Sequence, residues 1–242
     1  MFSNSAPELP FLESQGVLIP YDPAVITPAI AQAIESGVFE AEEAAQIPHI
    51  VRSNDVVLDI GAGIGFISTL ISRVAARVIS VEANPDLLPF MAELHRQNGV
   101  KNAERLNVVL GGAEGGMATF YQRTDFWMGS LAKGPNSYHS TVSVPQMALN
   151  PLLEREKITL IVCDIEGAES FLFDEAELCC VDRVYLELHD HITGLKGVAA
   201  VFAAMAARGF AYDPRYSNGA IVLFQRVDAN ERLRPYARIA RQ

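Results

Sequence analysis

The pattern of apolar and polar residues changes near residue 55. From there, short apolar runs alternate with segments of helical periodicity, which is typical of β–α units and a mostly parallel sheet. The predicted strands are Val56–Ile60, Arg77–Val81, Arg105–Leu110, Ile158–Asp164 and Arg183–Leu188. The pattern therefore predicts an α/β fold, with helices covering a central sheet.

Helices are predicted between these strands and before them. Gly65–Val74 and Asp86–Asn98 lie between the first three strands, and Ala199–Arg208 follows the last. Upstream, Ala24–Ser36 carries apolar residues at helical spacing, with a start expected near its first residues. A second short helix is expected over Ala41–Ile47.

The end of the chain has a different pattern. Phe210–Tyr212 and Ala220–Arg226 flank an Asp-Pro and Asn-Gly turn region without a helical segment between them. This arrangement predicts an antiparallel hairpin that completes a mostly parallel, seven-stranded sheet. The least regular stretch is Gly111–Asn150, which is long for one connection. We expect short strands inside it or a loop that covers substrate.

The same pattern suggests how the chain is organised. Residues 51–228 are expected to form one ligand-binding domain, and residues 1–50 an N-terminal arm with helices covering it. Within the arm, residues 1–22 are rich in proline and polar residues and have no periodicity. They are expected to lie over the domain or to be partly disordered. Residues 229–242 are expected to be a C-terminal tail.

Composition narrows the choice of partners. The 242 residues are half apolar, enough for a full core, and carry a formal charge of −10. That charge argues against nucleic acid or an anionic membrane as a partner and favours a small neutral or cationic substrate. Cys163, Cys179 and Cys180 lack the spacing of a disulfide framework or zinc site, and the N-terminus has no long apolar run. We expect a cytoplasmic protein, and a homodimer remains open.

A glycine-rich turn follows the first predicted strand, and an acid precedes it. Gly61, Gly63 and Gly65 permit a tight turn that leads into a helix, whose first N–H groups are free to bind a ligand. In the dinucleotide fingerprint the third glycine comes one residue later. Asp59 would repel a pyrophosphate, but it suits the cationic amino-acid end of S-adenosylmethionine. The turn therefore predicts an S-adenosylmethionine site rather than an NAD site.

The ends of the next two strands are expected to complete the nucleoside site. Glu82 follows the second strand, where its carboxylate can accept hydrogen bonds from both ribose hydroxyls. NAD enzymes share such an acid, so Glu82 supports nucleoside binding without selecting the cofactor. Asn107, near the end of the third strand, is expected to lie beside the adenine, and a core or loop role is its alternative.

Polar side chains also follow the fourth and fifth predicted strands. Asp164 ends the fourth strand, and ligands of open α/β sheets bind at the carboxyl ends of strands. Glu166 and Glu169 come next and are candidates to flank substrate or to begin a helix. In the fifth strand, alternation places Glu187 and His189 on one face. We predict Asp164, His189 and Glu187 as the catalytic residues.

The role of His189 leaves three alternatives. A histidine with its ordinary pKa near 6.5 suits a general base that takes a proton from a hydroxyl. Asp164, Glu187 and His189 would equally form a divalent-metal site, although their spacing lacks a metal signature, and no metal is predicted. The third alternative is a surface histidine without a chemical role.

These segments resemble the FkbM family of methyltransferases over about residues 37–224. Val57 to Phe66 resembles the family's first motif, Val81 to Pro85 its second, and Cys163 to Glu169 its Asp-x-Glu-Gly-Ala-Glu signature. Gly37 to Glu40 and Gly129 to Leu131 match weaker elements, and through the first of these Glu40 is expected to contact the cofactor.

The resemblance implies a Rossmann-like methyltransferase fold, S-adenosylmethionine as cofactor and S-adenosylhomocysteine as product. It further implies O-methylation of a hydroxyl on a sugar, a polyketide or another small molecule. Two alternatives are an NAD-dependent oxidoreductase and a non-catalytic module that binds a nucleoside. The spacing of the glycines and Asp59 disfavour the first, and the polar residues at several strand ends disfavour the second.

Overall fold

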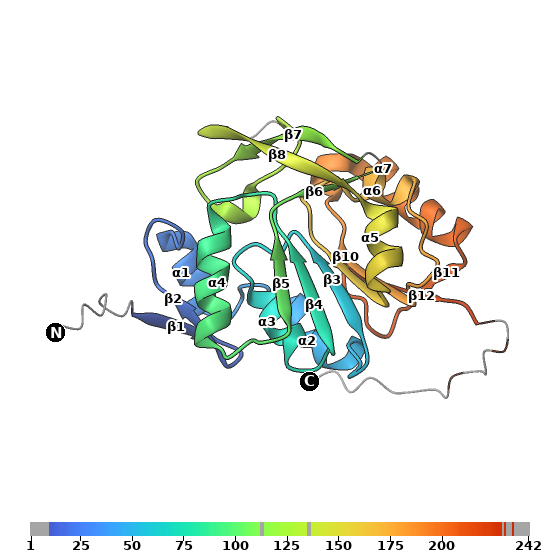
Figure 1. The fold of residues 1–242 in the computed structure, drawn as a ribbon, viewed down its shortest axis with the longest axis horizontal. Helices are drawn as coiled ribbons and strands as arrows, with labels where there is room; N and C mark the ends of the chain where they lie inside the picture. The colour runs from blue at the N-terminus through green and yellow to red at the C-terminus, as the bar shows by residue number, and fades with distance from the viewer. Residues whose placement is uncertain (1–9, 112–113, 135–136, 229, 231–233, 235–242) are drawn as a thin grey trace.

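The computed structural model describes residues 10–111, 114–134, 137–228, 230 and 234. A seven-stranded sheet forms its centre, in the order β11-β12-β10-β9-β3-β4-β5 (Figure 1). The strands from β10 to β5 are parallel, whereas β12 is antiparallel to both of its neighbours. The bounds are β3 (Val56–Ile60), β4 (Arg77–Val81), β5 (Ala103–Leu106), β9 (Leu160–Cys163), β10 (Arg183–Glu187), β11 (Phe210–Tyr212) and β12 (Ile221–Arg226). The expected mostly parallel sheet with a C-terminal hairpin is confirmed.

Helices cover both faces of this sheet. One hydrophobic cluster includes α1 (Pro28–Glu35), α2 (Ala41–Ile50), α3 (Phe66–Ser72) and α4 (Leu87–Gln97). The other includes α5 (Leu149–Glu156), α6 (Glu169–Asp174) and α7 (Asp190–Ala207). Because side chains alternate along a strand, Val57 packs in the first cluster and Leu58 in the second. In the described part of the chain, no helix has both the length and the apolar character that a membrane span needs.

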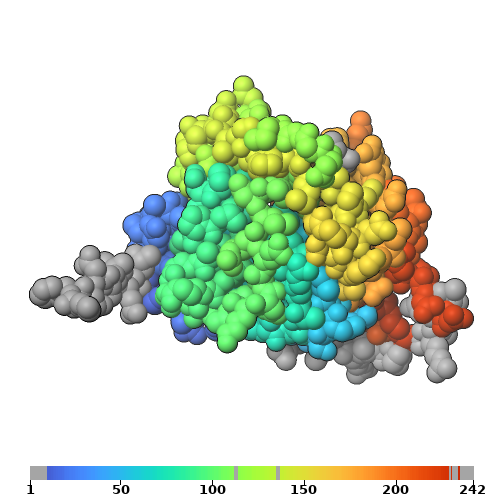
Figure 2. All heavy atoms as spheres, viewed as in Figure 1, coloured from blue at the N-terminus to red at the C-terminus, as the bar shows by residue number. Residues whose placement is uncertain are grey.

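A small second sheet lies over the carboxyl ends of the main strands. It consists of β6 (Val109–Gly111), β7 (Gly116–Gln122) and β8 (Ser140–Ala148), in the order β6-β8-β7. Figure 1 shows it across the top of the molecule, and the yellow-green spheres of Figure 2 form a continuous layer there. A short 3-10 turn, η1 (Phe126–Met128), connects β7 with β8. The irregular stretch Gly111–Asn150 therefore contains short strands, which is one of the two outcomes expected from the sequence.

The predicted strand Arg105–Leu110 is wrong as a single strand. β5 ends at Leu106, and β6 begins at Val109 in the other sheet. Between them, the side-chain amide of Asn107 donates to the carbonyl oxygens of Glu82 at 2.8 Å and Ala83 at 3.0 Å. These two hydrogen bonds hold the chain where it leaves the main sheet.

The N-terminal segment is more regular than its sequence indicated. β1 (Phe11–Ser14) and β2 (Val17–Pro20) form an antiparallel hairpin. Its turn residues Gln15 and Gly16 both have positive φ, as a two-residue hairpin turn of type I′ requires. Val17 is buried in the first hydrophobic cluster, which β3 also enters. Residues 1–9 and nearly all of the expected tail over 229–242 lie outside the described residues.

Two predicted helices begin elsewhere than expected. α1 begins at Pro28, because the hydroxyl of Thr27 accepts the N–H of Ile30 at 3.4 Å and proline suits the first helical position. α7 begins at Asp190 instead of Ala199. It has a kink at Gly194, whose φ of 64° is not helical.

Candidate active site

The first of three cavities lies where the carboxyl ends of β3, β4 and β9 meet the small sheet. This main cavity has a volume of about 240 Å³, whereas a bound water needs roughly 10–15 Å³. Its polar wall includes Gly61, Gly63, Glu82, Asp164 and Glu166. Its apolar wall includes Val108, Leu110, Phe120, Phe126, Trp127, Ile165, Phe171 and Leu172. The cavity therefore combines a polar edge at the strand ends with a wide apolar surface.

The glycine turn forms one edge of the main cavity. Gly61 and Gly63 have φ values of 82° and 52°, which L side chains rarely adopt. The N–H groups of Gly61 and Ala62 donate to the carbonyl oxygen of Val81, at 2.9 and 3.0 Å. A Cβ on Gly61 would lie 1.7 Å from the carbonyl oxygen of Asp164. Glycine is required there because the ends of β3 and β9 touch.

Gly65 has a different role from the one predicted. It does not line any of the three cavities described here. A Cβ at this position would lie 2.5 Å from Met91 Cγ and 2.9 Å from His95 Nε2, both on α4. The third glycine therefore lets α3 begin close to α4, and its contact with the cofactor stays a prediction.

Glu82 presents its carboxylate at the polar edge of the main cavity. Oε2 accepts the N–H of Gly63 at 2.8 Å, and Oε1 accepts the N–H of Asn84 at 2.6 Å. Burial raises the pKa of Glu82 to about 7, although these backbone donors oppose the shift. Each carboxylate oxygen retains acceptor capacity for a second donor. Asn107 lines none of the three cavities and supports the backbone of Glu82, so its place beside the adenine stays a prediction.

Asp59 lies behind the glycine turn, on the α2 face of the sheet. It is 3% exposed, and its Oδ2 is buried without a hydrogen-bond partner. Asp59 lines a second, small cavity of about 20 Å³, which four further acids also line: Glu40, Glu43, Asp164 and Glu187. Burial, and then the charge of Glu82, raise the pKa of Asp59 to about 7. The small cavity is thus rich in carboxyl groups.

A third, open cavity of about 460 Å³ adjoins the other two. Glu40 and Asp164 line all three cavities, so they lie at the junction. Glu40 precedes α2 with a φ of 48°, a strained value for a residue with a side chain. Burial and the neighbouring acids, Asp164 first, raise the pKa of Glu40 well above its usual range.

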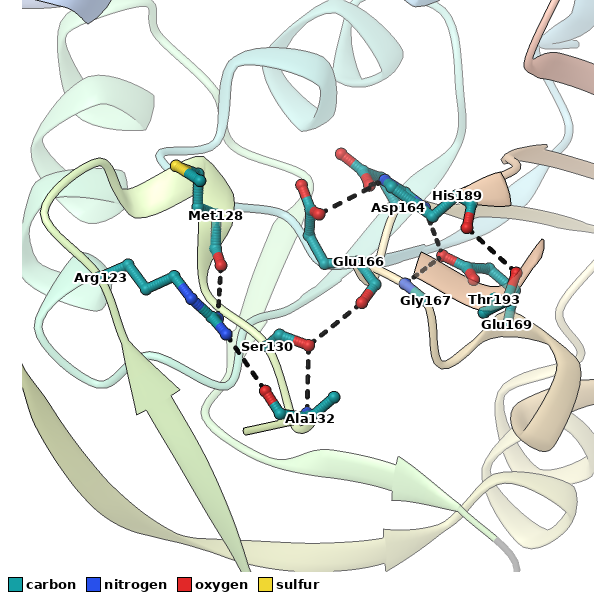
Figure 3. Close-up of polar contacts among 10 residues, drawn as sticks. All are labelled: Arg123, Met128, Ser130, Ala132, Asp164, Glu166, Gly167, Glu169, His189 and Thr193. Atoms are coloured by element: carbon teal, nitrogen blue, oxygen red, sulfur yellow. Dashed lines mark hydrogen bonds and ion pairs between the residues drawn. The ribbon is translucent and has the colours of Figure 1, made fainter. Parts of the chain in front are cut away.

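Asp164 faces His189 at the end of the neighbouring strand (Figure 3). Asp164 Oδ1 lies 3.3 Å from His189 Nε2, and Glu166 Oε2 lies 3.7 Å from the same nitrogen. On the other side of the ring, His189 Nδ1 lies 2.7 Å from Glu169 Oε1, which also accepts the N–H of Gly167. Burial raises the pKa of Asp164 well above its usual range, although the charge of His189 opposes the shift.

The environment of His189 does not fit the predicted general base. Its ring is buried, and it lines none of the three cavities. Burial lowers its pKa, but the hydrogen bond with Glu169 and the charges of the surrounding acids raise it to about 9. An imidazolium with that pKa holds its proton at neutral pH. His189 therefore fixes the loop that carries Asp164, and its role as a base stays a prediction that this environment does not favour.

Three of these side chains also have the geometry to hold a metal ion. The ligand atoms of Asp164, Glu166 and His189 lie within 4.8 Å of one another. Glu169 orients the histidine through its other nitrogen, as carboxylates do at many metal centres. Glu187, which the sequence grouped with Asp164 and His189, is not part of this set.

The sequence did not identify the residues that close the main cavity. Phe126 and Trp127 come from η1, and Trp127 is the one tryptophan of the chain, which was the available signal. The buried Arg123 holds this turn through the carbonyl oxygens of Met128 and Ala132 (Figure 3). Ser130 donates to the carbonyl oxygen of Glu166 at 3.1 Å and so joins the turn to the acidic loop.

Fold and site together define a class of protein. A glycine turn after the first strand, an acid ending the second and a cavity above both make a nucleoside site in a Rossmann-like methyltransferase fold. The family model for the methyltransferase FkbM domain matches residues 59–212, more than half of the chain. The protein belongs to the FkbM methyltransferase family, which confirms the resemblance of its motifs.

Several solved structures are similar at low sequence identity. Trm5b from Pyrococcus abyssi is 13% identical with a TM-score of 0.49, and the match covers 89% of this chain but 55% of that one. TYW2 from M. jannaschii, in complex with AdoMet, is 14% identical with a TM-score of 0.48, covering 92% and 89%. The ribosomal protein L11 methylase from Lactobacillus delbrueckii subsp. bulgaricus is 12% identical with a TM-score of 0.48, covering 79% and 80%. No curated protein matched the sequence.

Proposed function

We propose that this protein transfers a methyl group from S-adenosylmethionine to the hydroxyl oxygen of a small molecule such as a sugar or a polyketide. One observation supports this proposal most strongly. Asp164 lines the main cavity, the small cavity and the open cavity. A carboxylate at that junction would reach the hydroxyl of an acceptor that enters through the open cavity toward a cofactor in the main one.

The residues of the main cavity fit the cofactor. Glu82 would accept hydrogen bonds from the ribose hydroxyls, and the apolar wall beginning at Val108 would receive the adenine. The turn at Gly61 and Gly63 would allow close approach of the amino-acid portion. Asp59 and Glu40 would attract its ammonium group, because Asp59 Oδ2 is buried without a partner.

The protein contributes position and one proton acceptor. When bound, S-adenosylmethionine supplies an electrophilic methyl group on a sulfonium. Asp164 would take the proton that the acceptor hydroxyl loses when it is methylated. His189 holds Asp164 in place. The cavity walls align the two reactants, which is the main source of acceleration in such a reaction.

Cofactor binding, turnover and metal removal distinguish the proposed methyl transfer from its alternatives. Family membership favours methyl transfer over NAD-dependent hydride transfer. A non-catalytic nucleoside module would bind S-adenosylhomocysteine yet methylate nothing. If a divalent ion at Asp164, Glu166 and His189 activates the acceptor, a chelator abolishes turnover, and magnesium or manganese restores it. A cytoplasmic location and a homodimer remain predictions.

The proposal is tested by replacing Asp164. With an acceptor found by screening, Asp164→Asn is expected to lower turnover at least about a hundredfold while S-adenosylhomocysteine affinity is retained, because the proton acceptor is lost. The matched control is Asp174→Asn, an exposed acid at the end of α6. Turnover of Asp164→Asn close to that of the wild type would remove this residue from the chemistry.

A further inference from the structure

Trp127 lies where the main cavity and the open cavity meet. Among the described residues, four line both cavities: Glu40, Trp127, Asp164 and Glu166. With the cofactor in the main cavity and the acceptor in the open one, the methyl group passes between them at this boundary. We infer that the indole ring of Trp127, the one aromatic side chain of the four, contacts the methylsulfonium of S-adenosylmethionine and recognises its positive charge. This inference rests on the proposed methyl transfer.

The chemistry of a sulfonium favours an aromatic partner at this boundary. A methylsulfonium carries a positive charge but no N–H or O–H group, so it donates no conventional hydrogen bond to the three acids. The face of an indole ring carries negative electrostatic potential and attracts alkylated cations of this kind. The same face offers the methyl group an apolar surface. Tryptophan is the side chain for which this attraction is strongest.

The order of residues along the main cavity agrees with this placement. Glu82 fits the ribose, and the turn at Gly61 and Gly63 fits the amino-acid portion; the sulfur of the cofactor lies between these two parts. Phe126 packs over the same turn, because a Cβ on Gly63 would lie 3.4 Å from its Cε2. Trp127 follows Phe126 in η1 and extends the aromatic wall to the open cavity. The turn thus brings Trp127 to the side of the cavity where the methyl group has to leave.

The indole ring is held in place by the protein itself. Phe39 stacks on it with ring centroids 6.1 Å apart and planes 28° from parallel. The ring is partly buried against the first hydrophobic cluster. Two hydrogen bonds fix η1: Asp125 Oδ1 accepts the hydroxyl of Thr27 at 2.6 Å, and Arg123 donates to the carbonyl oxygen of the last residue of η1 at 2.7 Å. Because the ring is already ordered, little of its attraction for a cation is lost to ordering on binding.

The inferred contact distinguishes the cofactor from its product. S-adenosylhomocysteine has neither the methyl group nor the charge on sulfur, so a cation–π contact strengthens binding of the cofactor and leaves that of the product unchanged. The positive charge on sulfur decreases in the transition state, so the contact favours cofactor binding and product release rather than the chemical step. A Trp127 that only packs as part of the wall would affect both ligands alike.

The inference is tested by measuring the Kd of S-adenosylmethionine and of S-adenosylhomocysteine for each variant by isothermal titration calorimetry, without an acceptor. Trp127→Leu removes the aromatic face but keeps an apolar side chain, whereas Trp127→Phe keeps an aromatic ring. The measured quantity is the preference for the cofactor, which is the Kd of S-adenosylhomocysteine divided by that of S-adenosylmethionine. We expect this ratio to fall at least about fivefold in Trp127→Leu and about twofold in Trp127→Phe, whose ring attracts a cation less strongly.

The control is Phe171→Leu, which removes an aromatic ring that lines the main cavity but not the open one. Phe171 is 81% exposed, so this change is expected to leave the fold intact. Phe171→Leu is expected to change both affinities by the same factor and to leave their ratio as in the wild type.

An unchanged ratio in Trp127→Leu, or an equal fall of the ratio in Trp127→Leu and Trp127→Phe, would overturn the inference and leave the proposed function standing. If circular dichroism shows that Trp127→Leu is not folded, the ratio in Trp127→Phe decides: a fall supports the inference, and an unchanged ratio overturns it. Failure of the wild type to bind either ligand would instead count against the proposed function itself.

Discussion

The buried acids at the two ends of the same strands differ in their hydrogen bonding. Before β3, both carboxylate oxygens of Asp55 accept hydrogen bonds from Arg183, the first residue of β10, at 2.6 and 3.1 Å. At the other ends of these strands, Asp59 has an oxygen without a partner, and it lines the small cavity with Glu187, where the described lining contains no lysine, arginine or histidine. Asp55 and Asp59 are equally buried, at 1% and 3% exposed.

The contrast separates an acid that stabilises the fold from acids that serve a ligand. Asp55 also accepts the N–H of Arg52 and the hydroxyl of Thr159, so its hydrogen bonds are complete within the protein. A buried charge that lacks such partners is costly, and proteins retain it where function needs it. The carboxyl end of the sheet therefore carries a buried acid that is available to a ligand, at a cost in stability.

The largest expected effect is at the paired end. Arg183→Met removes the partner of Asp55 and leaves a buried, uncompensated carboxylate, which costs about 3–5 kcal/mol of unfolding free energy. Urea denaturation measures this loss. The double variant Asp55→Leu/Arg183→Met removes both charges and is expected to recover much of the stability. A loss of unfolding free energy below about 1 kcal/mol in Arg183→Met would contradict the proposed difference between the two ends of the strands.

The next effect concerns cofactor affinity. Glu82→Ala removes charge-assisted hydrogen bonds to two ribose hydroxyls, each worth about 1.5–3 kcal/mol, so S-adenosylhomocysteine should bind at least about 100-fold more weakly. Isothermal titration calorimetry measures this affinity. Glu104→Gln, a half-exposed acid on β5, is the control and should bind as the wild type does. Unchanged affinity in Glu82→Ala would remove the ribose assignment.

The smallest effect is a gain of stability that depends on pH. The folded-state pKa of Asp59, about 7, lies above its ordinary 3.8, so its contribution to stability is fully present below about pH 4 and is lost as pH rises through 7. Asp59→Asn removes this loss and should stabilise the ligand-free protein by about 1–4 kcal/mol at pH 8, with little change near pH 4.

Urea denaturation at both pH values measures this gain. Equal effects of Asp59→Asn at the two pH values would show that Asp59 does not carry a raised pKa. A loss of stability at pH 8 would show that its charge is compensated within the protein, as that of Asp55 is.

The sequence was sufficient to predict those features that depend on a single segment of the chain. Apolar runs located the main strands, and alternation placed Asp59, Asp164 and Glu187 at the ends of β3, β9 and β10, which are neighbours in the sheet. The contacts made by Gly65, Asn107 and His189 were not predictable in this way. Each depends on a partner from another element, such as α4 for Gly65 and Glu169 for His189, and no local pattern records it.

Two further kinds of feature were not predicted. One is a hairpin whose strands are too short to show a clear pattern, and the other is contacts between residues far apart in the sequence. Four-residue strands made the hairpin of β1 and β2 difficult to distinguish from an irregular arm. Glu43 lies on α2 and Glu187 ends β10, far apart in the sequence, so their place in the lining of one cavity has no signal in sequence spacing. The pairing of Arg183 with Asp55 is equally distant in sequence.

The central claim is that the main cavity binds the methyl donor rather than a dinucleotide. It is tested most directly by titrating the wild-type protein with S-adenosylhomocysteine and with NAD in parallel calorimetric experiments. The account predicts saturable binding of S-adenosylhomocysteine and no measurable binding of NAD, because the carboxyl group of Asp59 would repel a pyrophosphate. Tight binding of NAD, or no binding of S-adenosylhomocysteine, would contradict it.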